Sequence, residues 1–404
     1  MTACYAPFRV QLILAGAHFP VLRLVILAVW CRLLARKEVK DFRFTSMDKL
    51  FLWWVGTSVF MGWLMKPNLS FMYIMGFAYN ALGIYFLARV SLKTVGDFFR
   101  LLECFAWILT PLVLLMLVEV FYQRNFFSFL FGLPEIIWIR DGSVRAMGNF
   151  DNPIMAGSLG ASFFPLYVGL WCCDKLGRIY AIVGIFCSLI MVLASKSGGP
   201  LSALFVSFLG FAFWPMKYHM QWVRRAIVLC VIILALVMKA PVWYFIARVG
   251  DVAGGGAWHR AYTIDQAIRH FDEWWLSGTW KTIHWSPGEG TMPMGDPNHM
   301  DLTNQYIVEG VRGGLLKLGL FLAMIVCSFK VVGNLVRKSA KEIGWQFFLW
   351  SLGVYLTTQC VIYLSVSYFE QSIIFWYLFL AVVSLLHVEG FINHTGLGNE
   401  EEAA

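Results

Sequence analysis

The sequence predicts an all-α polytopic membrane protein with about eleven spans and one large loop outside the bilayer. Of its 404 residues, 59% are hydrophobic and 14% are charged, with a mean hydropathy of +0.67. Soluble domains carry about 25% charged residues. The apolar residues also collect into runs of about 20, the length at which a helix crosses the hydrocarbon core. These two observations assign the whole chain, 1–404, to a single integral membrane domain.

The apolar runs give the expected spans, and the first run is the weakest. His18, Pro20 and Arg23 interrupt it, so we expect either a short hairpin or the remnant of two helices there. No basic segment precedes it, which argues against a cleaved signal peptide. The number of spans is therefore about 11, within a range of about 10–12. The runs are 13–31, 50–65, 70–88, 103–122, 153–172, 178–195, 199–215, 226–246, 313–333, 345–366 and 370–388.

The basic residues predict which loops are cytoplasmic. Eighteen of the thirty-two Lys and Arg residues fall in five short loops, at 32–49, 89–100, 175–178, 217–225 and 330–341. Because positive loops stay on the cytoplasmic side, segment 244–312 faces outward, into the periplasm if the membrane is a bacterial inner membrane. The tail 391–404 is expected to be cytoplasmic and disordered. Topology thus accounts for the net charge of +8, and we expect no nucleic-acid partner.

The outward segment 244–312 is the polar centre of the chain. A polar backbone of this length stays outside the hydrocarbon, because each unsatisfied group would cost several kcal/mol there. Residues 258–275 repeat aromatic and apolar side chains at steps of three and four, which predicts an amphipathic helix. On this helix Arg269 has Asp265 and Glu273 as possible partners at i±4. The segment holds four of the eight histidines, His259, His270, His284 and His299.

The nine cysteines predict neither disulfides nor a metal site. They lie outside the polar segment and almost all of them lie in apolar runs, where cysteine is a small packing residue. No CxxC pair stands near paired histidines, so a zinc site is not expected. We therefore predict no metal and no cofactor.

Arg260 is the strongest candidate ligand for an anion. It has no acidic residue at i±3 or i±4, and it follows glycines 254–256 at the expected start of a helix. The N-terminus of a helix favours negative charge. The alternative is an arginine that extends to lipid headgroups or pairs across the fold.

Two further outward segments add cations. In RDGSVRAMGNFDNPIMAGSLGAS, Asn152 and Pro153 predict a capped helix start, preceded by Arg145. Here the alternative is that Arg140 and Arg145 are only solvated. Gly157, Gly160 and Ala161 then give that helix a face for close contact. In the turn SKSGGP, Lys196 lies among small residues whose N–H groups can face an anion, although an ordinary tight turn has the same sequence.

The end of the polar segment, PNHMDLTNQYIVEGVRGG, brings several polar residues to the membrane surface. Histidine takes a proton from a hydroxyl near neutral pH, which makes His299 the first candidate for a general base. His259 and Asp301 are its rivals, and a purely structural histidine is the alternative. Asn304, Glu309 and Arg312 complete the candidate set.

The chain resembles the O-antigen ligase and Wzy-type polysaccharide polymerase superfamily. The likeness covers most of the chain and rests on three patterns. Arg145 precedes GNFDNPIMAGSLGA, similar to the family's Arg and G-x-F-x-N-P. The SKSG turn has Lys196 where the family commonly has arginine. TNQYIVEGVRGGLLKL is similar to the family's H-N-x-Y-L pattern, except that Thr303 stands at the histidine position, and His299 lies one turn earlier.

The resemblance implies a GT-C-like, metal-independent, inverting glycosyltransferase. Its donor would be a glycan on undecaprenyl pyrophosphate, drawn from the membrane lipid. Arg145, Lys196 and Arg260, with Arg312, Glu309 and Asn304 nearby, would bind the substrate, and His299 or Asp301 would be the base. The acceptor would be another glycan chain or lipid A core, in exopolysaccharide or O-antigen biosynthesis. The displaced histidine favours a polymerase slightly over a ligase.

A transporter or lipid-linked oligosaccharide flippase is the alternative class. Such folds often contain internal repeats and helices broken at the bilayer midplane. The two halves of this chain show no repeat, and its polar residues gather at one face. The sequence therefore favours the transferase.

Overall fold

The computed structural model describes residues 2–5, 11–14, 17–39, 42–65, 71–132, 134–140, 142–245, 257–286, 298–368 and 371–389. The predicted tail 391–404 lies outside these residues. So do 246–256 and 287–297 of the polar segment, including glycines 254–256.

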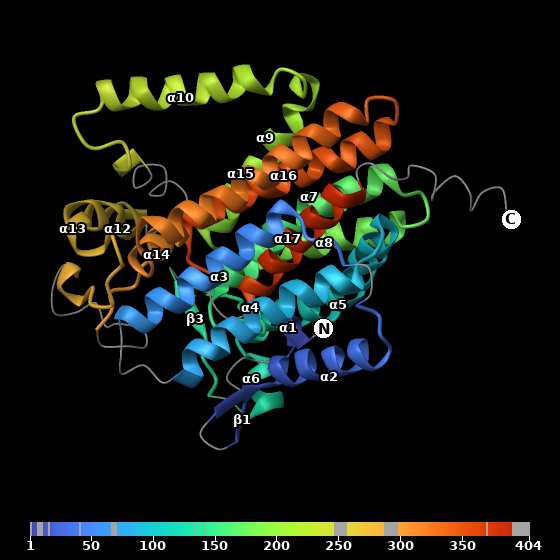
Figure 1. The fold of residues 1–404 in the computed structure, drawn as a ribbon, viewed down its shortest axis with the longest axis horizontal. Coiled ribbons are helices and arrows are strands. Elements are labelled where there is room, and N and C mark those ends of the chain that lie inside the picture. The colour runs from blue at the N-terminus through green and yellow to red at the C-terminus, as the bar shows by residue number, and fades with distance from the viewer. Residues whose placement is uncertain are drawn as a thin grey trace, which may run out of the picture.

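Most of the long helices lie side by side in a bundle (Figure 1). Ten of them correspond to the expected runs from 50–65 onward. These ten are α3 (Ser46–Met65), α4 (Phe71–Ser91), α5 (Val95–Tyr122), α7 (Pro153–Cys173), α8 (Arg178–Ser195), α9 (Gly198–Ala212), α10 (Met220–Val237), α15 (Gly314–Lys338), α16 (Ile343–Ser365) and α17 (Ser372–Glu389).

Seven helices within the described residues are long and apolar enough to cross a membrane: α4, α5, α7, α8, α10, α15 and α16. Helices α9 and α17 are apolar but shorter. The structure thus supports a multi-pass, all-α membrane protein. It does not reach the predicted count of eleven by this measure.

The first apolar run is not one helix. It begins with two paired strands, β1 (Gln11–Leu14) and β2 (Ala17–Pro20), and continues as the 15-residue helix α2 (Val21–Ala35). Pro20 precedes the first residue of α2, and proline fits a helix start better than a helix interior. The hairpin interpretation of this run is therefore the correct one.

Short elements complete the chain and lie mainly near the ends of the long helices. They are α1 (Thr2–Tyr5), α6 (Phe126–Phe131), β3 (Trp138–Arg140), β4 (Ser143–Arg145), η1 (Trp214–Met216), α12 (Ala257–Arg269), α13 (Phe271–Trp274), η2 (Ile283–Trp285) and α14 (Gln305–Val311). Strands β3 and β4 pair in an antiparallel hairpin, with Trp138 opposite Arg145.

Helix α7 lies at the centre of the core and packs against α8, α9 and α16. Asn152 caps it as predicted: its Oδ1 accepts from the Ile154 N–H at 2.9 Å, and Pro153 follows. Its glycines allow close contact with α8. A Cβ at Gly160 would lie 2.6 Å from the Ser188 carbonyl oxygen, so any side chain there would separate the helices.

Helix α10 stands apart from the bundle (Figure 1). In the most apolar 18-residue stretch of α10, only 6% of the residues are buried, against 83% in that of α7. Trp222, Leu229 and Leu236 on α10 are all exposed. An apolar helix with so little protein contact is suited to a lipid environment, which agrees with a membrane-spanning role.

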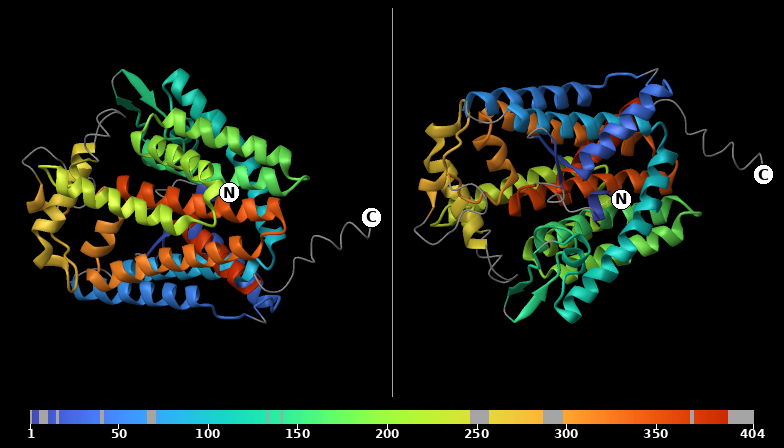
Figure 2. Two further views of the ribbon diagram at one scale, coloured as in Figure 1. Left: turned by 90° about the horizontal axis from the view of Figure 1, so that it is seen from above. Right: turned by 90° about the horizontal axis from the view of Figure 1, so that it is seen from below.

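The two ends of the bundle differ in character. Helices α12 and α13 gather at one end, and the α7–α8 and α15–α16 turns lie at the other (Figures 1 and 2). These two turns belong to the basic loops that the sequence assigns to the cytoplasm. The segment at the α12 end has its own small core, formed by Ala267, Trp274, Trp285, Met300, Leu302, Val308 and Val311.

Candidate functional site

Arg145 lies at the end of β4, against the turn between α8 and α9. Its side chain is buried, with 6% of the residue exposed. Nη2 donates to Ser197 Oγ at 2.6 Å, and Nε donates to the Ser195 carbonyl at 3.3 Å. The next residue, Ala146, donates its N–H to the Ala194 carbonyl at 3.0 Å. The hairpin therefore holds Arg145 on the predicted SKSG turn.

Glu119, near the end of α5, fixes the segment that follows Arg145. Its carboxylate accepts from the N–H groups of Met147 at 3.2 Å and Gly148 at 2.9 Å. Gly148 has φ +59°, and a Cβ there would lie 3.1 Å from Met116 Cγ. The glycine of the GNFDNP pattern is thus needed for both its backbone conformation and its close packing.

Arg260 reaches the same turn from α12. Its Nε donates to the Ser365 carbonyl at 3.0 Å. A Cβ built on Gly199 would lie 3.6 Å from Arg260 Nη2. Gly199 is the second residue of α9, and Ser197, which Arg145 contacts, is the N-cap position of the same helix. Arg145 and Arg260 therefore lie beside the N-terminus of α9.

The electrostatics of this turn favour an anion. Burial lowers the pKa of Arg145, and the positive charges of Arg140 and Arg260 lower it further. Burial and the charge of Arg140 likewise lower the pKa of Arg260. Among the described residues, neither Arg145 nor Arg260 forms an ion pair with a carboxylate. Buried charges are normally paired, so this positive cluster is suited to an anionic ligand. We call Arg145, Arg260 and the start of α9 the arginine site.

Lys196 lies on the turn of the arginine site but points less deeply into the protein. It is exposed and ends α8 in the left-handed conformation, with φ 43° and ψ 46°. No cap hydrogen bond from a side chain occupies the start of α9. The turn therefore presents a lysine charge next to a helix N-terminus, where backbone N–H groups attract negative charge.

Asn304 and Glu309 lie in the interior and have protein partners. Asn304 caps α14 by accepting from the Tyr306 and Ile307 N–H groups at 3.0 and 3.2 Å. Glu309 accepts from Trp54 Nε1 at 2.9 Å and from Gln305 Nε2 at 2.6 Å, and pairs with Lys317 Nζ at 3.3 Å. These contacts give Asn304 a structural role at the start of α14, and they make Glu309 a link between α14, α3 and α15.

His299 and Arg312 both lie close to Trp280. The ring of His299 meets that of Trp280 edge-on, with centroids 4.5 Å apart. The Arg312 guanidinium carbon lies 6.0 Å from the Trp280 ring, at the limit of a cation–π contact.

Asp301 is tied to the helix that carries Arg260. His259 Nε2 lies 3.0 Å from the Asp301 carbonyl oxygen, and His259 precedes Arg260 in α12. Asp301 is exposed, but the surrounding protein partly desolvates its carboxyl and raises its pKa, and the nearby His259 offsets part of this rise. The contact is made by the backbone of Asp301, and it holds this residue beside the start of α12.

The predicted helix 258–275 is interrupted at His270, where α12 ends and α13 begins. Arg269 pairs with Asp265 at 2.7 Å. Glu273, its other expected partner, instead lies between His270 and His284. Burial raises the pKa of Glu273, but hydrogen bonds from His284, His270 and Trp285 outweigh it and hold this pKa below its usual value. The HxxE spacing was the available signal for this cluster, which the sequence analysis missed.

Comparison with known proteins yields no matching family model, and a search of curated proteins likewise finds no match.

Proposed function

We propose that the protein is a membrane glycosyltransferase whose donor is a glycan linked to a lipid pyrophosphate, and that the arginine site binds the pyrophosphate. One observation carries the proposal: Arg145 and Arg260 converge on the start of α9 without a carboxylate partner among the described residues. A guanidinium makes bidentate contacts to phosphate oxygens. The lipid tail of such a donor would lie in the membrane beside the apolar helices.

The proposed reaction uses these charges on the leaving group. As the bond between the sugar and the pyrophosphate breaks, negative charge develops on the phosphate oxygen. Arg145, Arg260 and the α9 N-terminus would stabilise that charge, with Lys196 beside them. The acceptor hydroxyl attacks from the opposite side and the sugar carbon inverts. No metal step is needed in this scheme.

Asp301 is the proposed base for the acceptor hydroxyl, with His299 as the alternative. The carboxylate form of Asp301 takes the proton, and its raised pKa makes it a better base than an ordinary aspartate. Its link through His259 to α12 places its backbone near the helix that presents Arg260. The exposed Trp275 can stack on a sugar ring.

Reconstitution tests the proposal. The purified protein in liposomes is given a labelled glycan on undecaprenyl pyrophosphate, with either a second lipid-linked glycan or a lipid A core as acceptor. A lengthened or transferred glycan supports the transferase, and the productive acceptor separates polymerase from ligase. A glycan that changes leaflet without changing length would instead establish the flippase alternative.

Sidedness is part of the same proposal: α12–α14 face the periplasm and the α15–α16 turn faces the cytoplasm of a bacterial inner membrane. Single cysteines are placed at Lys281 and Ala340, both exposed, in a variant without the native cysteines. A membrane-impermeant reagent should label Lys281→Cys in intact cells and Ala340→Cys only after lysis. The reverse pattern would place the arginine site in the cytoplasm and contradict the proposal.

A further inference from the structure

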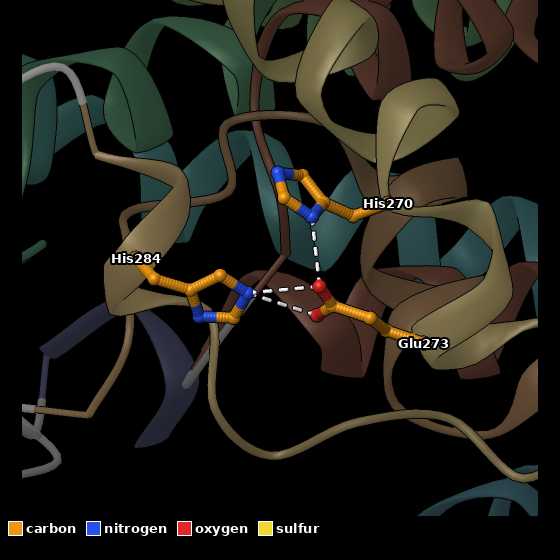
Figure 3. Close-up of side chains that lie close together, drawn as sticks. All are labelled: His270, Glu273 and His284. Atoms are coloured by element: carbon orange, nitrogen blue, oxygen red, sulfur yellow. Dashed lines mark hydrogen bonds and ion pairs between the residues drawn. The ribbon is translucent and has the colours of Figure 1, made fainter.

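His270, Glu273 and His284 form a compact cluster in the polar segment (Figure 3). His270 Nδ1 lies 2.7 Å from Glu273 Oε1. His284 Nε2 lies 3.0 Å from each carboxylate oxygen. One nitrogen from each ring and one carboxylate oxygen all lie within 4.8 Å of one another. Both rings therefore direct a nitrogen at the same carboxylate.

Contacts from Trp285 and Tyr262 hold this cluster in place. Trp285 is fully buried and stacks on His270, with ring centroids 5.3 Å apart and planes 13° apart. Its Nε1 donates to Glu273 Oε2 at 3.2 Å. Tyr262, on α12, donates its hydroxyl to the Trp285 carbonyl at 2.8 Å. The turn that carries His284 is thus fixed to the helices that carry His270 and Glu273, which is the support that metal ligands need.

The front of the cluster is open to solvent. The side chains of His270, Glu273 and His284 are 30%, 29% and 47% exposed. A cation can therefore enter and keep a water molecule in a fourth position. Two imidazoles and one carboxylate are a common donor set for Zn²⁺ and suit other first-row divalent ions.

We propose that His270, Glu273 and His284 bind a divalent transition-metal cation of the zinc class. The cation would replace the contacts that the two rings now make to the Glu273 carboxylate. His284 lies in η2, eleven residues after Glu273 in α13. A metal bound by all three residues would therefore link η2 to α12 and α13.

This site is separate from the arginine site. His270 follows Arg260 by ten residues, and at 1.5 Å per helical residue the two positions lie about 15 Å apart along α12. The metal therefore has no place in the proposed transfer step. Its effect is on the stability and shape of the segment that carries Arg260.

Cobalt binding to the detergent-purified full-length protein tests the inference. The protein carries an affinity tag without histidine, is stripped with a chelator and is titrated with Co²⁺, whose visible absorption reports low-coordinate nitrogen and oxygen ligation. We expect one equivalent of Co²⁺, displaced by Zn²⁺. Zn²⁺ should also raise the unfolding temperature, because a ligand that binds only the folded state stabilises it.

Two variants and one control identify the ligands. Glu273→Gln keeps size and hydrogen bonding but should abolish the cobalt spectrum. Trp285→Phe keeps the stacked ring and loses the indole N–H, and should weaken affinity about 10-fold or more. Asp272→Asn removes the neighbouring exposed carboxylate and should change nothing. Absence of binding in the wild type, or equal binding in Glu273→Gln, Trp285→Phe and the wild type, would overturn the proposal.

Discussion

Two buried arginines in this protein have opposite surroundings. Arg89, near the end of α4, is 8% exposed and pairs with Asp48, which is 0% exposed, at 3.0 Å. Arg145 is 6% exposed, and its partners are a carbonyl and a hydroxyl. Asp48 also accepts from Tyr85 Oη at 2.6 Å and from the Thr45 N–H at 2.6 Å. One arginine is neutralised by the protein and the other is not.

This difference distinguishes Arg89, whose charge stabilises the fold, from Arg145, whose charge we propose binds a ligand. Removing a charged group from water is costly unless a partner compensates it. The Asp48 site supplies that partner from α3, and hydroxyls from Tyr85 and Ser384 saturate the carboxylate. Arg145 and Arg260 lack such a partner among the described residues, and the positive charge of Arg260 adds to the cost of burying Arg145. This contrast is the reason for our proposal that an anionic ligand supplies the negative charge at the arginine site.

The largest expected effect is on the free energy of unfolding, at the Arg89–Asp48 pair. Asp48→Ala leaves Arg89 buried without its carboxylate, so we expect a loss of about 3–5 kcal/mol in the free energy of unfolding. Unfolding in detergent, followed by circular dichroism, measures it. Asp97→Ala is the control, because Asp97 completes an exposed capping box with Thr94 and should cost about 1 kcal/mol. Equal losses in the two variants would show that the Asp48 pair is not a structural charge pair.

The second expected effect distinguishes the arginine site from the Arg89–Asp48 pair by its effect on activity. Arg145→Met and Arg260→Met each remove an uncompensated charge, so unfolding free energy should change by only about 1 kcal/mol. Glycan transfer should fall about 100-fold or more, because each arginine stabilises the leaving pyrophosphate. Arg89→Met should instead cause a large loss of stability, because it leaves Asp48 buried without its partner.

Arg269→Ala is the matched activity control for Arg260, since Arg269 lies on the same helix and is paired with Asp265. It should retain transfer. If Arg145→Met and Arg260→Met unfold as readily as Arg89→Met, their charges are compensated in the native protein and the contrast fails.

The pH dependence of glycan transfer tests which residue is the base for the acceptor hydroxyl. A carboxylate base is active when ionised, so activity is lost as pH falls through the pKa of Asp301. This pKa is raised, so the acidic limb should lie above about 3.9, the value for an ordinary aspartate. Asp301→Asn should remove this limb and cut the rate about 10²–10⁴-fold. A limb that survives in Asp301→Asn and vanishes in His299→Ala would assign the base to His299.

The smallest expected effect concerns the exposed charge on the turn. Lys196→Gly removes a charge and relieves a left-handed backbone, and Gln123→Gly relieves the same conformation, φ 56°, at the end of α5 without removing a charge. Both should stabilise the protein by up to about 1 kcal/mol. Only Lys196→Gly should weaken anion binding, by about two- to fivefold. Equal binding in the two variants would remove Lys196 from the site.

Local patterns in the sequence predicted much of this arrangement. Asn152 and Pro153 mark a helix start because capping depends on adjacent residues alone, and the glycines of α7 pack closely as expected. Arg145, Lys196 and Arg260 were selected separately, and the structure places all three at one turn. Their binding of phosphate remains a prediction.

Long-range partners account for what the sequence did not predict. Glu309 reads as an outward carboxylate, yet Trp54, 255 positions away, donates to it. His284 meets Glu273 only because the chain returns after a turn. Such pairings depend on the packing of distant segments, which periodicity does not contain.

Ligand binding at the arginine site tests the central claim most directly. The purified wild type, Arg145→Met, Arg260→Met and Arg269→Ala are titrated with a short-chain polyprenyl pyrophosphate in detergent, at one fixed ionic strength. The account predicts that the wild type and Arg269→Ala bind equally and that each of the other two binds at least about tenfold more weakly, because a charge-assisted contact is lost. Equal affinity in all four proteins would contradict it.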